Sequence, residues 1–264
     1  MTSSAKPAVL ITGASSGIGA VYADRFARRG HDLVLVARDL GRLDALAERL
    51  RRESGVAVDT LRADLTDPGD RAAVEARLRD DERIGVLVNN AGAALKGSFL
   101  DQSLEEITDL IALNATALTR LARVAAERFA AQGAGSIVNL ASVVGFAPEI
   151  GLTVYGATKA FVLFLSQGLH LELGPKGVYV QAVLPAATRT EIWERSGRDV
   201  DALPAVMDSG ALVDAALLGF DRRETITIPP LHDAGQWERY DAARRAMVPN
   251  VMQVQPAPRY RDPA

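Results

Sequence analysis

The sequence predicts an α/β protein with a doubly wound sheet of about seven parallel strands and helices on both faces. Three observations carry this prediction. Short apolar segments alternate with longer ones whose apolar residues recur at helical spacing. The short segments are apolar almost throughout, as strands buried on both faces are. A glycine-rich turn follows the first of them directly, and right-handed helical crossovers between such strands give the Rossmann-type arrangement.

The N-terminal segments are predicted to form two strand–helix pairs. Ala8–Thr12 (AVLIT) is a strand, and Ile18–Arg29 is a helix that ends at a glycine. Asp32–Ala37 (DLVLVA) is the second strand. Asp39–Arg52 follows as an amphipathic helix, because its leucines recur at helical spacing.

The next two pairs have the same form. Val56–Leu61 is the third strand, and Pro68–Arg79 is a helix with proline in its first turn, where proline is favoured. Gly85–Asn89 is the fourth strand. The long apolar-periodic segment Leu104–Ala131 is predicted as one helical region.

The last predicted strands complete the sheet. Ser136–Leu140 (SIVNL) is the fifth strand, and Val154–Leu173 is a helix stopped by the Gly-Pro that follows it. Val178–Leu184 is the sixth strand. A helix over Ala205–Phe220 leads to the seventh strand, Thr225–Ile228.

Composition argues against several kinds of protein and site. The 264 residues have a formal charge of −3, which disfavours a nucleic-acid partner. The chain has no cysteine and three scattered histidines, so no metal site is expected. It has no apolar run of the ~18 residues that span a bilayer, and its first ten residues lack the apolar core of a signal peptide. We therefore expect a single domain over residues 1–264, in the cytoplasm, without a membrane partner.

The turn after the first strand is a candidate phosphate-binding site. Its glycines let the backbone approach a pyrophosphate, and the helix that follows offers free N–H groups to the anion. The spacing differs from the common G-x-G-x-x-G fingerprint, so a purely structural turn is the competing interpretation. The position after a first strand favours the functional one. The candidate cofactor-binding residues are Gly13, Ser15, Ser16, Gly17, Ile18 and Gly19.

The end of the second strand bears on which dinucleotide is bound. An acidic residue there would bind the ribose 2′-hydroxyl and repel a 2′-phosphate. The chain has Ala37 followed by Arg38, whose guanidinium suits a phosphate, although a solvated surface charge is the alternative. Asp39 is the competing ribose ligand, but we favour it as the N-cap of the next helix. The sequence therefore favours NADP(H) over NAD(H).

Four polar residues are candidates for catalysis. Tyr155 and Lys159 lie four apart in a predicted helix, so their side chains share a face. An adjacent ammonium favours the phenolate and brings the tyrosine pKa of about 10 nearer to neutral pH. Such a pair alone also occurs by chance on exposed helices. It is accompanied here by Ser142, just past the fifth strand, and by Asn114, inside a helix where asparagine is unfavourable.

In combination these motifs resemble those of the conventional short-chain dehydrogenase/reductase family. The resemblance runs from about Ala8 to Pro230 and implies an NADP(H)-dependent oxidoreductase that acts on a ketone or 3-oxoacyl group and the corresponding alcohol. The shared motifs are TGASSGIG at 12–19, Asp64, NNAG at 89–92, Asn114, Ser142 and YGATK at 155–159.

The resemblance implies a role for each catalytic candidate. Tyr155 is the general acid in carbonyl reduction and the base in alcohol oxidation. Lys159 lowers the pKa of the tyrosine and binds the nicotinamide ribose. Ser142 orients the carbonyl oxygen, and Asn114 holds a water in the proton relay behind the lysine.

The resemblance also extends the cofactor site. Asp64 and Leu65 flank the adenine, and Thr190 meets the pyrophosphate. A basic residue at the position of Arg38 marks NADP preference, although Ser16 stands where the family often has a second basic residue. The other implied cofactor contacts are Asn90, Ala91, Gly92, Tyr155, Lys159, Pro185 and Thr188.

The region after the sixth strand departs from the family pattern. Ala186 replaces the usual glycine of Pro-Gly-x-x-x-Thr, so it is either strained or narrows the site beside the nicotinamide. Residues 185–210 take the place of the family's variable substrate lid, and about 232–264 form a C-terminal extension with a loose tail. The expected substrate contacts are Val144, Ile150, Ile192 and Trp193.

The resemblance implies a homodimer or homotetramer with the helices at Leu104–Ala131 and Val154–Leu173 in the interface. A non-catalytic dinucleotide sensor or scaffold on the same fold is the alternative function. The four catalytic candidates argue against it, because a sensor needs the glycine turn but not those groups.

Overall fold

The computed structural model describes residues 6–195, 197 and 199–261. Its contacts divide the chain into two compact units, Met1–Pro230 and Leu231–Ala264. This boundary lies next to the predicted start of the C-terminal extension, and the interpretation of the chain as one domain stays a prediction. Residues 196 and 198 of the predicted lid and residues 262–264 of the predicted tail lie outside the described residues.

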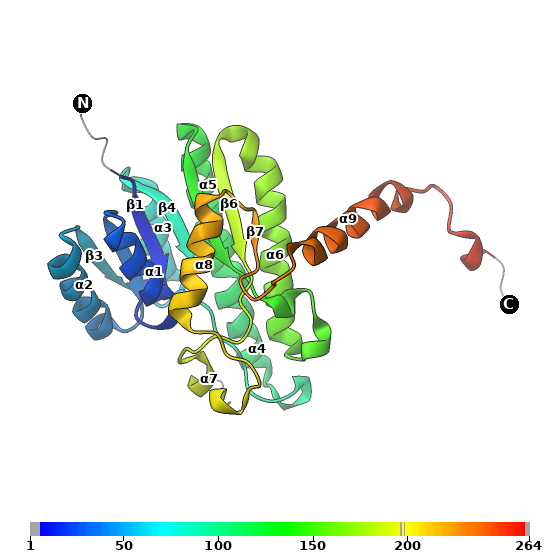
Figure 1. Ribbon diagram of the computed structural model, residues 1–264, viewed down its shortest axis with the longest axis horizontal. Coiled ribbons are helices and arrows are strands. Elements are labelled where there is room, and N and C mark those ends of the chain that lie inside the picture. The colour runs from blue at the N-terminus through cyan, green and yellow to red at the C-terminus, as the bar shows by residue number, and fades with distance from the viewer. Residues whose placement is uncertain (1–5, 196, 198, 262–264) are drawn as a thin grey trace. The chain divides into compact units, whose positions relative to one another are not determined.

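A seven-stranded parallel sheet forms the centre of the first unit (Figure 1). The strand order is β3-β2-β1-β4-β5-β6-β7, so the chain grows outward from β1 in both directions and confirms the predicted doubly wound fold. In such sheets ligands bind beyond the carboxyl ends of the strands, where the order reverses between β1 and β4. The strands are β1 (Ala8–Thr12), β2 (Leu33–Ala37), β3 (Val58–Arg62), β4 (Ile84–Asn89), β5 (Gly135–Leu140), β6 (Val178–Val183) and β7 (Ile226–Thr227).

Helices cover both faces of this sheet. Those of the first unit are α1 (Gly17–Arg28), α2 (Leu40–Ser54), α3 (Pro68–Asp80), α4 (Leu104–Ile111), α5 (Leu118–Gln132), α6 (Thr153–Leu173), α7 (Ile192–Arg195) and α8 (Ser209–Asp221). Except where noted below, the predicted strand and helix bounds agree with these to within two residues.

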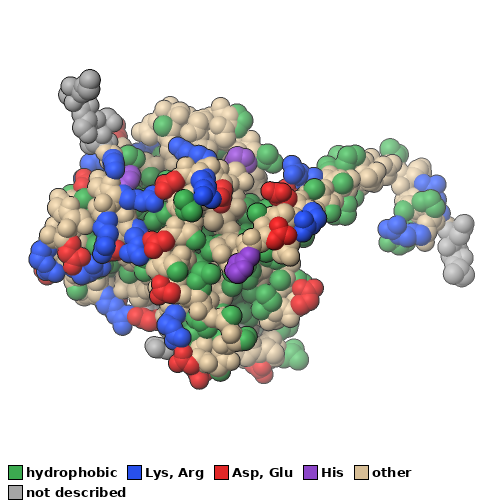
Figure 2. All heavy atoms as spheres, viewed as in Figure 1, with side chains coloured by type: hydrophobic (Ala, Val, Ile, Leu, Met, Phe, Trp, Pro, Cys, Tyr) green, Lys and Arg blue, Asp and Glu red, His purple; other side chains and the backbone are tan. Residues whose placement is uncertain are grey.

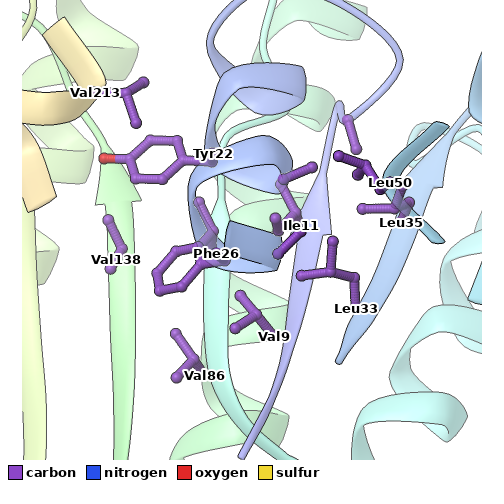
Figure 3. Packing of buried hydrophobic residues seen from close by; sticks show 14 of the residues in the cluster. Val9, Ile11, Tyr22, Phe26, Leu33, Leu35, Leu50, Val86, Val138 and Val213 are labelled. Carbon is purple, nitrogen blue, oxygen red and sulfur yellow. The ribbon is translucent and has the colours of Figure 1, made fainter. Parts of the chain in front are cut away.

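Two apolar cores form because successive strand residues point to opposite faces. Val9 of β1 belongs to a core shared with α1, α2 and α8, whereas the next residue, Leu10, belongs to a core shared with α3 and α5. Figure 3 shows Phe26 of α1 beside Val9 and Val86 of the sheet, and Tyr22 between Val138 of the sheet and Val213 of α8. Full burial of a side chain of this size stabilises a fold by about 1.5–3 kcal/mol. These contacts fix α1 against the sheet.

The helix predicted over Leu104–Ala131 is interrupted, so the prediction of one regular helix is wrong. α4 ends at Ile111, Ala112–Ala117 forms a π-helical turn, and α5 begins at Leu118. A π-helical turn inserts one extra residue while the chain stays helical. The apolar periodicity on either side therefore gives no sign of it.

Two other predicted boundaries differ for local reasons. The helix predicted from Ala205 begins at Ser209, because the Asp208 carboxylate caps it by accepting a hydrogen bond of 3.0 Å from the N–H of Ala211. The strand predicted over Thr225–Ile228 is limited to Ile226–Thr227 at the sheet edge. The two prolines that follow it cannot donate ladder hydrogen bonds.

The surface of the first unit carries mixed charge. Figure 2 shows Lys and Arg side chains interspersed with Asp and Glu over the visible face. Between α1 and α8, for example, Arg29 and Asp221 form an ion pair of 2.8 Å. Exposed pairs of this kind contribute about 0–1 kcal/mol each. No helix within the described residues is long and apolar enough to cross a membrane.

The second unit consists mainly of one helix, α9 (Ala234–Val251), and none of its residues is buried. Asp233 caps it by accepting a hydrogen bond from the N–H of Gly235 at 2.9 Å. A short 3₁₀ turn, Pro258–Tyr260, follows in the part predicted as a loose tail.

Candidate active site

A cavity of about 840 Å³ opens at the carboxyl edge of the sheet. Its walls come from the residues that end β2 and β5 and from those that follow β1, β3, β4 and β6. All the predicted site residues line it except Gly19 and Asn114. Those that line it are Gly13, Ser15, Ser16, Gly17, Ile18, Arg38, Asp64, Leu65, Asn90, Ala91, Gly92, Ser142, Val144, Ile150, Tyr155, Lys159, Pro185, Thr188, Thr190, Ile192 and Trp193.

The glycine turn requires its glycines. Gly13 and Gly17 have φ of +66° and +54°, in the left-handed region where a side chain is disfavoured. Gly19 does not line the cavity but lies against the turn itself. A Cβ at this position would collide with the Gly13 carbonyl oxygen. The role of Gly19 is therefore to let α1 pack closely against the turn.

The N-terminus of α1 is left open toward the cavity. Side chains of Asp39, Asp67, Ser103 and Asp208 accept hydrogen bonds from the first backbone N–H groups of α2, α3, α4 and α8. At α1 the N-cap residue, Ser16, makes no such bond. Uncapped N–H groups and the positive end of the helix dipole form a phosphate site. The turn and the helix end together fit the pyrophosphate of a dinucleotide.

Thr12 holds the two loops at the switch point together. Its buried hydroxyl accepts hydrogen bonds from the N–H groups of Asn90 and Ala91, each at 3.0 Å. The Asn90 amide donates in return to the carbonyls of Thr12 and Gly13, at 2.8 and 3.2 Å. Asn90 thus supports the glycine turn from below, in addition to lining the cavity.

The adenine end of the cavity contains the residues that bear on cofactor choice. Arg38 follows β2 with 68% of its side chain exposed, and its Nη1 lies 3.7 Å from a carboxylate oxygen of Asp64. Asp39 accepts a hydrogen bond of 3.0 Å from the N–H of Arg42, which confirms it as the N-cap of α2. Ala37 has no carboxylate that would repel a 2′-phosphate. Arg38 is therefore the cation that an adenosine 2′-phosphate would meet.

The catalytic helix α6 begins at the cavity wall. Leu152, just before it, has a φ of +64°, a strained conformation for a branched side chain, and it lines the cavity. Tyr155 lies in the first turn of α6. The Ser142 loop approaches this helix closely because Gly145 has no Cβ, which would lie 2.8 Å from the Lys159 carbonyl carbon. The Ser142 hydroxyl donates to the Pro185 carbonyl at 3.0 Å.

Lys159 is buried one turn further along α6, with 5% of its surface exposed. Its ammonium donates to the carbonyl of Leu140, at the end of β5, at 2.7 Å. The Nζ atom lies 5.6 Å from the centre of the Tyr155 ring. The ammonium therefore sits at the end of the sheet, beside the phenol.

The pKa values of this pair are set mainly by burial. Burial raises the pKa of Tyr155 to about 12, and the hydrogen bond with Ser142 acts in the opposite direction. Burial also lowers the pKa of Lys159 to about 8. The sequence-based expectation that the ammonium lowers the tyrosine pKa is not met in this structure: burial raises that pKa, and the opposing contribution comes from the hydrogen bond with Ser142.

Asn114 lies behind the lysine, in the π-helical turn Ala112–Ala117, and only 1% of it is exposed. Its Oδ1 accepts from the N–H of Ala93, and its Nδ2 donates to the Ala93 carbonyl and to Thr158 Oγ1, at 3.0, 3.0 and 3.1 Å. A Cβ on Gly92 would lie 3.3 Å from Asn114 Oδ1 and 3.6 Å from the Lys159 ammonium. Asn114 therefore joins the β4 loop to α6, and its predicted water-holding role stays a prediction.

The opposite end of the cavity is apolar. The Trp193 indole N–H donates to the Thr188 carbonyl at 2.7 Å, which fixes the ring within the predicted lid. The nonpolar residues around this end are Leu95, Val143, Val144, Ile150, Leu152, Ile192, Trp193, Leu203 and Pro204. Within the described residues, the only basic side chains lining the whole cavity are Arg38 and Lys159.

Ala186 was expected either to be strained or to narrow the site beside the nicotinamide, and the structure shows no strain in its backbone. Outside glycine, the described residues with positive φ are Leu152 and Arg223. Ala186 lines the cavity and is exposed to it. Its methyl group therefore acts by occupying space.

We expect Ala186→Gly to raise kcat/KM for the bulkiest ketones that the protein accepts, by about tenfold, because one methyl-sized change in a pocket alters binding by about 1–3 kcal/mol. Steady-state kinetics with a graded series of ketones measure this. The smallest ketone in the series is the internal control and should change little. Equal kcat/KM values for the variant and the parent across the series would show that the methyl group is not limiting.

Several residues of the site were not singled out from the sequence. Thr12 and Thr158 act through hydrogen bonds to residues far away in the chain. Leu95, Leu152 and Leu203 lie in loops whose apolar residues have no periodicity. Glu191 lines the cavity and has the ordinary sequence context of a surface acid. Only Thr12 had a sequence signal, its place at the start of the glycine turn.

Comparisons with known proteins agree with this geometry. Residues 7–201 match the family model described as short chain dehydrogenase. The chain is 37% identical, over 187 residues and 69% of its length, to a very-long-chain 3-oxoacyl-CoA reductase of Bos taurus. It spans 60% of the length of that relative.

Two solved structures are similar over nearly the whole chain. A short-chain dehydrogenase from Sphingobium yanoikuyae, solved in complex with NADPH, is 68% identical, covering 97% of this chain and 100% of the other, with a TM-score of 0.96. A "bulky-bulky ketone specific alcohol dehydrogenase" from Comamonas testosteroni is 59% identical, covering 98% and 100%, with a TM-score of 0.92. The likeness includes the lid and the C-terminal extension as well as the glycine turn.

Proposed function

Because the chain belongs to the short-chain dehydrogenase/reductase family, we propose that it is an NADP(H)-dependent oxidoreductase that interconverts a ketone and a secondary alcohol. The observation that carries this proposal is the meeting of Ser142, Tyr155 and Lys159 on one wall of a cavity. One end of that cavity fits a dinucleotide and the other is apolar. The NADPH bound to the Sphingobium relative and the cation at Arg38 support NADP(H) as the cofactor.

The residues of this chain supply orientation and proton transfer. The Ser142 hydroxyl donates to the Pro185 carbonyl in this structure. When a substrate binds, the hydroxyl would turn its single proton to the carbonyl oxygen of the substrate and so orient that oxygen toward Tyr155. Tyr155 donates its proton to that oxygen during reduction and accepts it back during oxidation. Because burial raises its pKa to about 12, the phenol is protonated at neutral pH and ready to donate. The nicotinamide, when bound, supplies or accepts the hydride at the carbonyl carbon.

Lys159 is placed to assist both the proton and the cofactor. Its ammonium, held by the Leu140 carbonyl, stabilises negative charge on the Tyr155 oxygen after the proton has left. The same ammonium would donate a hydrogen bond to the nicotinamide ribose of a bound cofactor. Asn114 holds the β4 loop against α6 at this point, through Ala93 and Thr158, so that the lysine keeps its position.

For the substrate, we propose ketones with a bulky apolar group on each side of the carbonyl. The apolar end of the cavity, walled by Trp193 and Ile150, suits such groups. The Comamonas relative is named for this specificity. A 3-oxoacyl-CoA thioester, the substrate named for the Bos taurus relative, is the second candidate. It is disfavoured because the described lining has no basic side chain at this end to meet coenzyme A phosphates.

The alternative of a non-catalytic sensor or scaffold is not favoured. Such a protein needs the glycine turn and the adenine end of the cavity but has no use for a buried lysine beside a tyrosine. Burying an ammonium is costly, as its lowered pKa indicates. Because this chain keeps a buried lysine at that cost, together with Ser142 and Asn114, it keeps the groups that proton transfer needs.

The test is oxidation of NADPH and NADH by the purified protein with ketones, diketones and 3-oxoacyl thioesters of graded size. We expect turnover with NADPH, highest for ketones with two bulky substituents. Tight binding of NADPH without turnover of any carbonyl compound would favour the sensor. Faster turnover of 3-oxoacyl-CoA than of free ketones would replace the proposed substrate class.

The pH dependence of reduction tests the role assigned to Lys159. Since its pKa is about 8, its charge is lost as the pH rises through that value, whereas Tyr155, with a pKa of about 12, stays protonated. We expect kcat/KM for ketone reduction to be constant below pH 7 and to fall above pH 8. Thermal unfolding measured over the same range is the control for loss of structure. A rate that stays constant up to pH 10 would show that the ammonium is not required in its charged form.

We further propose that the protein is a homo-oligomer, a dimer or tetramer. Leu104 of α4 and Phe164 and Leu171 of α6 are 77%, 76% and 75% exposed, an unusual state for large apolar side chains. They lie on the helices that the family resemblance puts in an interface. Light scattering coupled to size-exclusion chromatography measures the mass directly, and a monomer of 28.1 kDa would contradict the proposal. The cytoplasm stays the predicted compartment.

A further inference from the structure

The lid, residues 185–210, is tied to the wall of the cofactor site by one ion pair between distant parts of the chain. Glu191 lies between two residues that line the cavity, Thr190 and Ile192. Arg42 lies in the first turn of α2, beside Asp39. Its Nη1 is 2.7 Å from both carboxylate oxygens of Glu191, and its Nε is 3.5 Å from Asp39. The lid is thereby joined to the helix that follows Arg38.

The lid is otherwise held together mainly by its own contacts. Its two ends pair as a short parallel bridge, in which the N–H of Arg189 donates to Met207 and the N–H of Met207 donates to Ala187, each at 2.9 Å. Arg189 also pairs with Asp201 at 2.8 Å within the lid. These contacts close the segment at its base, so that displacing one part of it would carry the rest along.

At its start the lid is held by the Pro185 carbonyl, which accepts hydrogen bonds of 3.0 Å from the Ser142 hydroxyl and from the N–H of Val143. Gly197 lies against the side chain of Lys96 in the β4 loop. Among the ion pairs of described residues, Arg42–Glu191 alone joins the lid to another element. Its two ends belong to different segments beside the cofactor site: α2 follows the adenine end, and Glu191 follows Thr190, which packs against Gly17 of the glycine turn.

We propose that Arg42 and Glu191 form a latch that closes the lid over the bound dinucleotide and slows its release. The inference rests on the proposed function, because it assumes that NADP(H) binds in the cavity. Arg42 and Glu191 are positioning residues in this role, since neither touches the reacting atoms. Both side chains are partly exposed, at 52% and 36%, so the latch is weak enough to open in each catalytic cycle.

The test is the rate of NADPH dissociation from the binary complex, measured by stopped-flow fluorescence with excess NADP⁺ as the competitor. We expect Glu191→Gln and Arg42→Gln each to release NADPH about two- to fivefold faster, the factor that loss of a partly exposed ion pair produces. Raising the ionic strength should speed release from the parent protein more than from Glu191→Gln, because salt screens the latch only in the parent while it weakens the contact between Arg38 and the 2′-phosphate in both.

Two controls separate the latch from other effects. Asp221→Asn removes the Arg29–Asp221 pair, which has similar geometry but joins α1 to α8 away from the cavity, and it should leave the release rate unchanged. The charge-swapped double variant Arg42→Glu/Glu191→Arg should release NADPH more slowly than either of its single variants. A merely structural loss would not be rescued by the swap.

The outcomes that overturn the proposal are distinct. An equal rate of NADPH release from Glu191→Gln and Asp221→Asn would show that the ion pair does not act as a latch. Slower release from Glu191→Gln would show that the carboxylate competes with the cofactor's phosphate for Arg42, which is the opposite role. Failure of the parent protein to bind NADPH at all would instead refute the proposed function, and the latch with it.

Discussion

Tyr155→Phe is expected to abolish ketone reduction while leaving NADPH affinity within about twofold of the parent. The substitution removes one oxygen and, with it, the proton that the proposed mechanism transfers to the substrate carbonyl. Positioned general acid catalysis contributes about 10²–10⁴-fold to a rate, so a loss of at least about 10³ is expected. Steady-state turnover and fluorescence titration with NADPH measure the two quantities separately.

A matched control for this variant is available within the chain. Tyr179 on β6 is also a buried tyrosine, and its hydroxyl donates to the Glu224 carbonyl at 2.6 Å, away from the cavity. Tyr179→Phe should lower the free energy of unfolding by about 1 kcal/mol and leave turnover unchanged. Retained activity in Tyr155→Phe would remove the phenol from the mechanism and shift the proton donor to Ser142 or to water.

The second large effect is expected from Arg38→Asp, which should reverse the preference for NADPH over NADH. The substitution removes a charge-assisted contact with the 2′-phosphate, worth about 1.5–3 kcal/mol, and places a like charge next to it. The ratio of kcat/KM values for the two cofactors is therefore expected to fall by about 10²-fold or more. The new carboxylate could also accept a hydrogen bond from the ribose of NADH.

Arg62→Asp is the control for the cofactor variant. Arg62 ends β3 in register with Ala37 of β2, is ion-paired with Asp70 at 3.1 Å and does not line the cavity. The Arg62→Asp substitution makes the same change of charge one strand away. The ratio of kcat/KM for NADPH to that for NADH should stay as in the parent. An unchanged ratio in Arg38→Asp would assign the choice of cofactor to other residues, with Arg42 the nearest cation on α2.

The sequence predicted those parts of the site that depend on local chemistry. The glycine turn requires residues without a side chain at fixed places, and the Tyr155–Lys159 spacing puts two groups on one helix face, so both leave a local pattern. The parallel, doubly wound sheet followed from the alternation of strands with helices. The capping of α2 by Asp39 was also predictable, because a short polar side chain before an amphipathic helix has one favoured role.

What the sequence did not predict depends on contacts between distant residues. The pKa of Tyr155 moves opposite to the expected direction, because burial, which is a property of the folded chain, raises it. The bond between Thr12 and the β4 loop and the ion pair between Arg42 and Glu191 join residues more than 70 positions apart. A single sequence contains no record of which distant polar groups meet.

The π-helical turn at Ala112–Ala117 makes the candidate site sensitive to the length of its helix. One residue adds about 100° of rotation to a regular α-helix. Deleting Ala115 would let α4 and α5 join as a regular helix, yet it would turn the side chains on one side of the joint away from those on the other. Asn114 could then no longer face Ala93 and Thr158 while the apolar residues of α5 stay on the sheet. The extra residue thus meets two requirements at once, since the apolar residues of α5 stay on the sheet while Asn114 keeps its hydrogen bonds to Ala93 and Thr158.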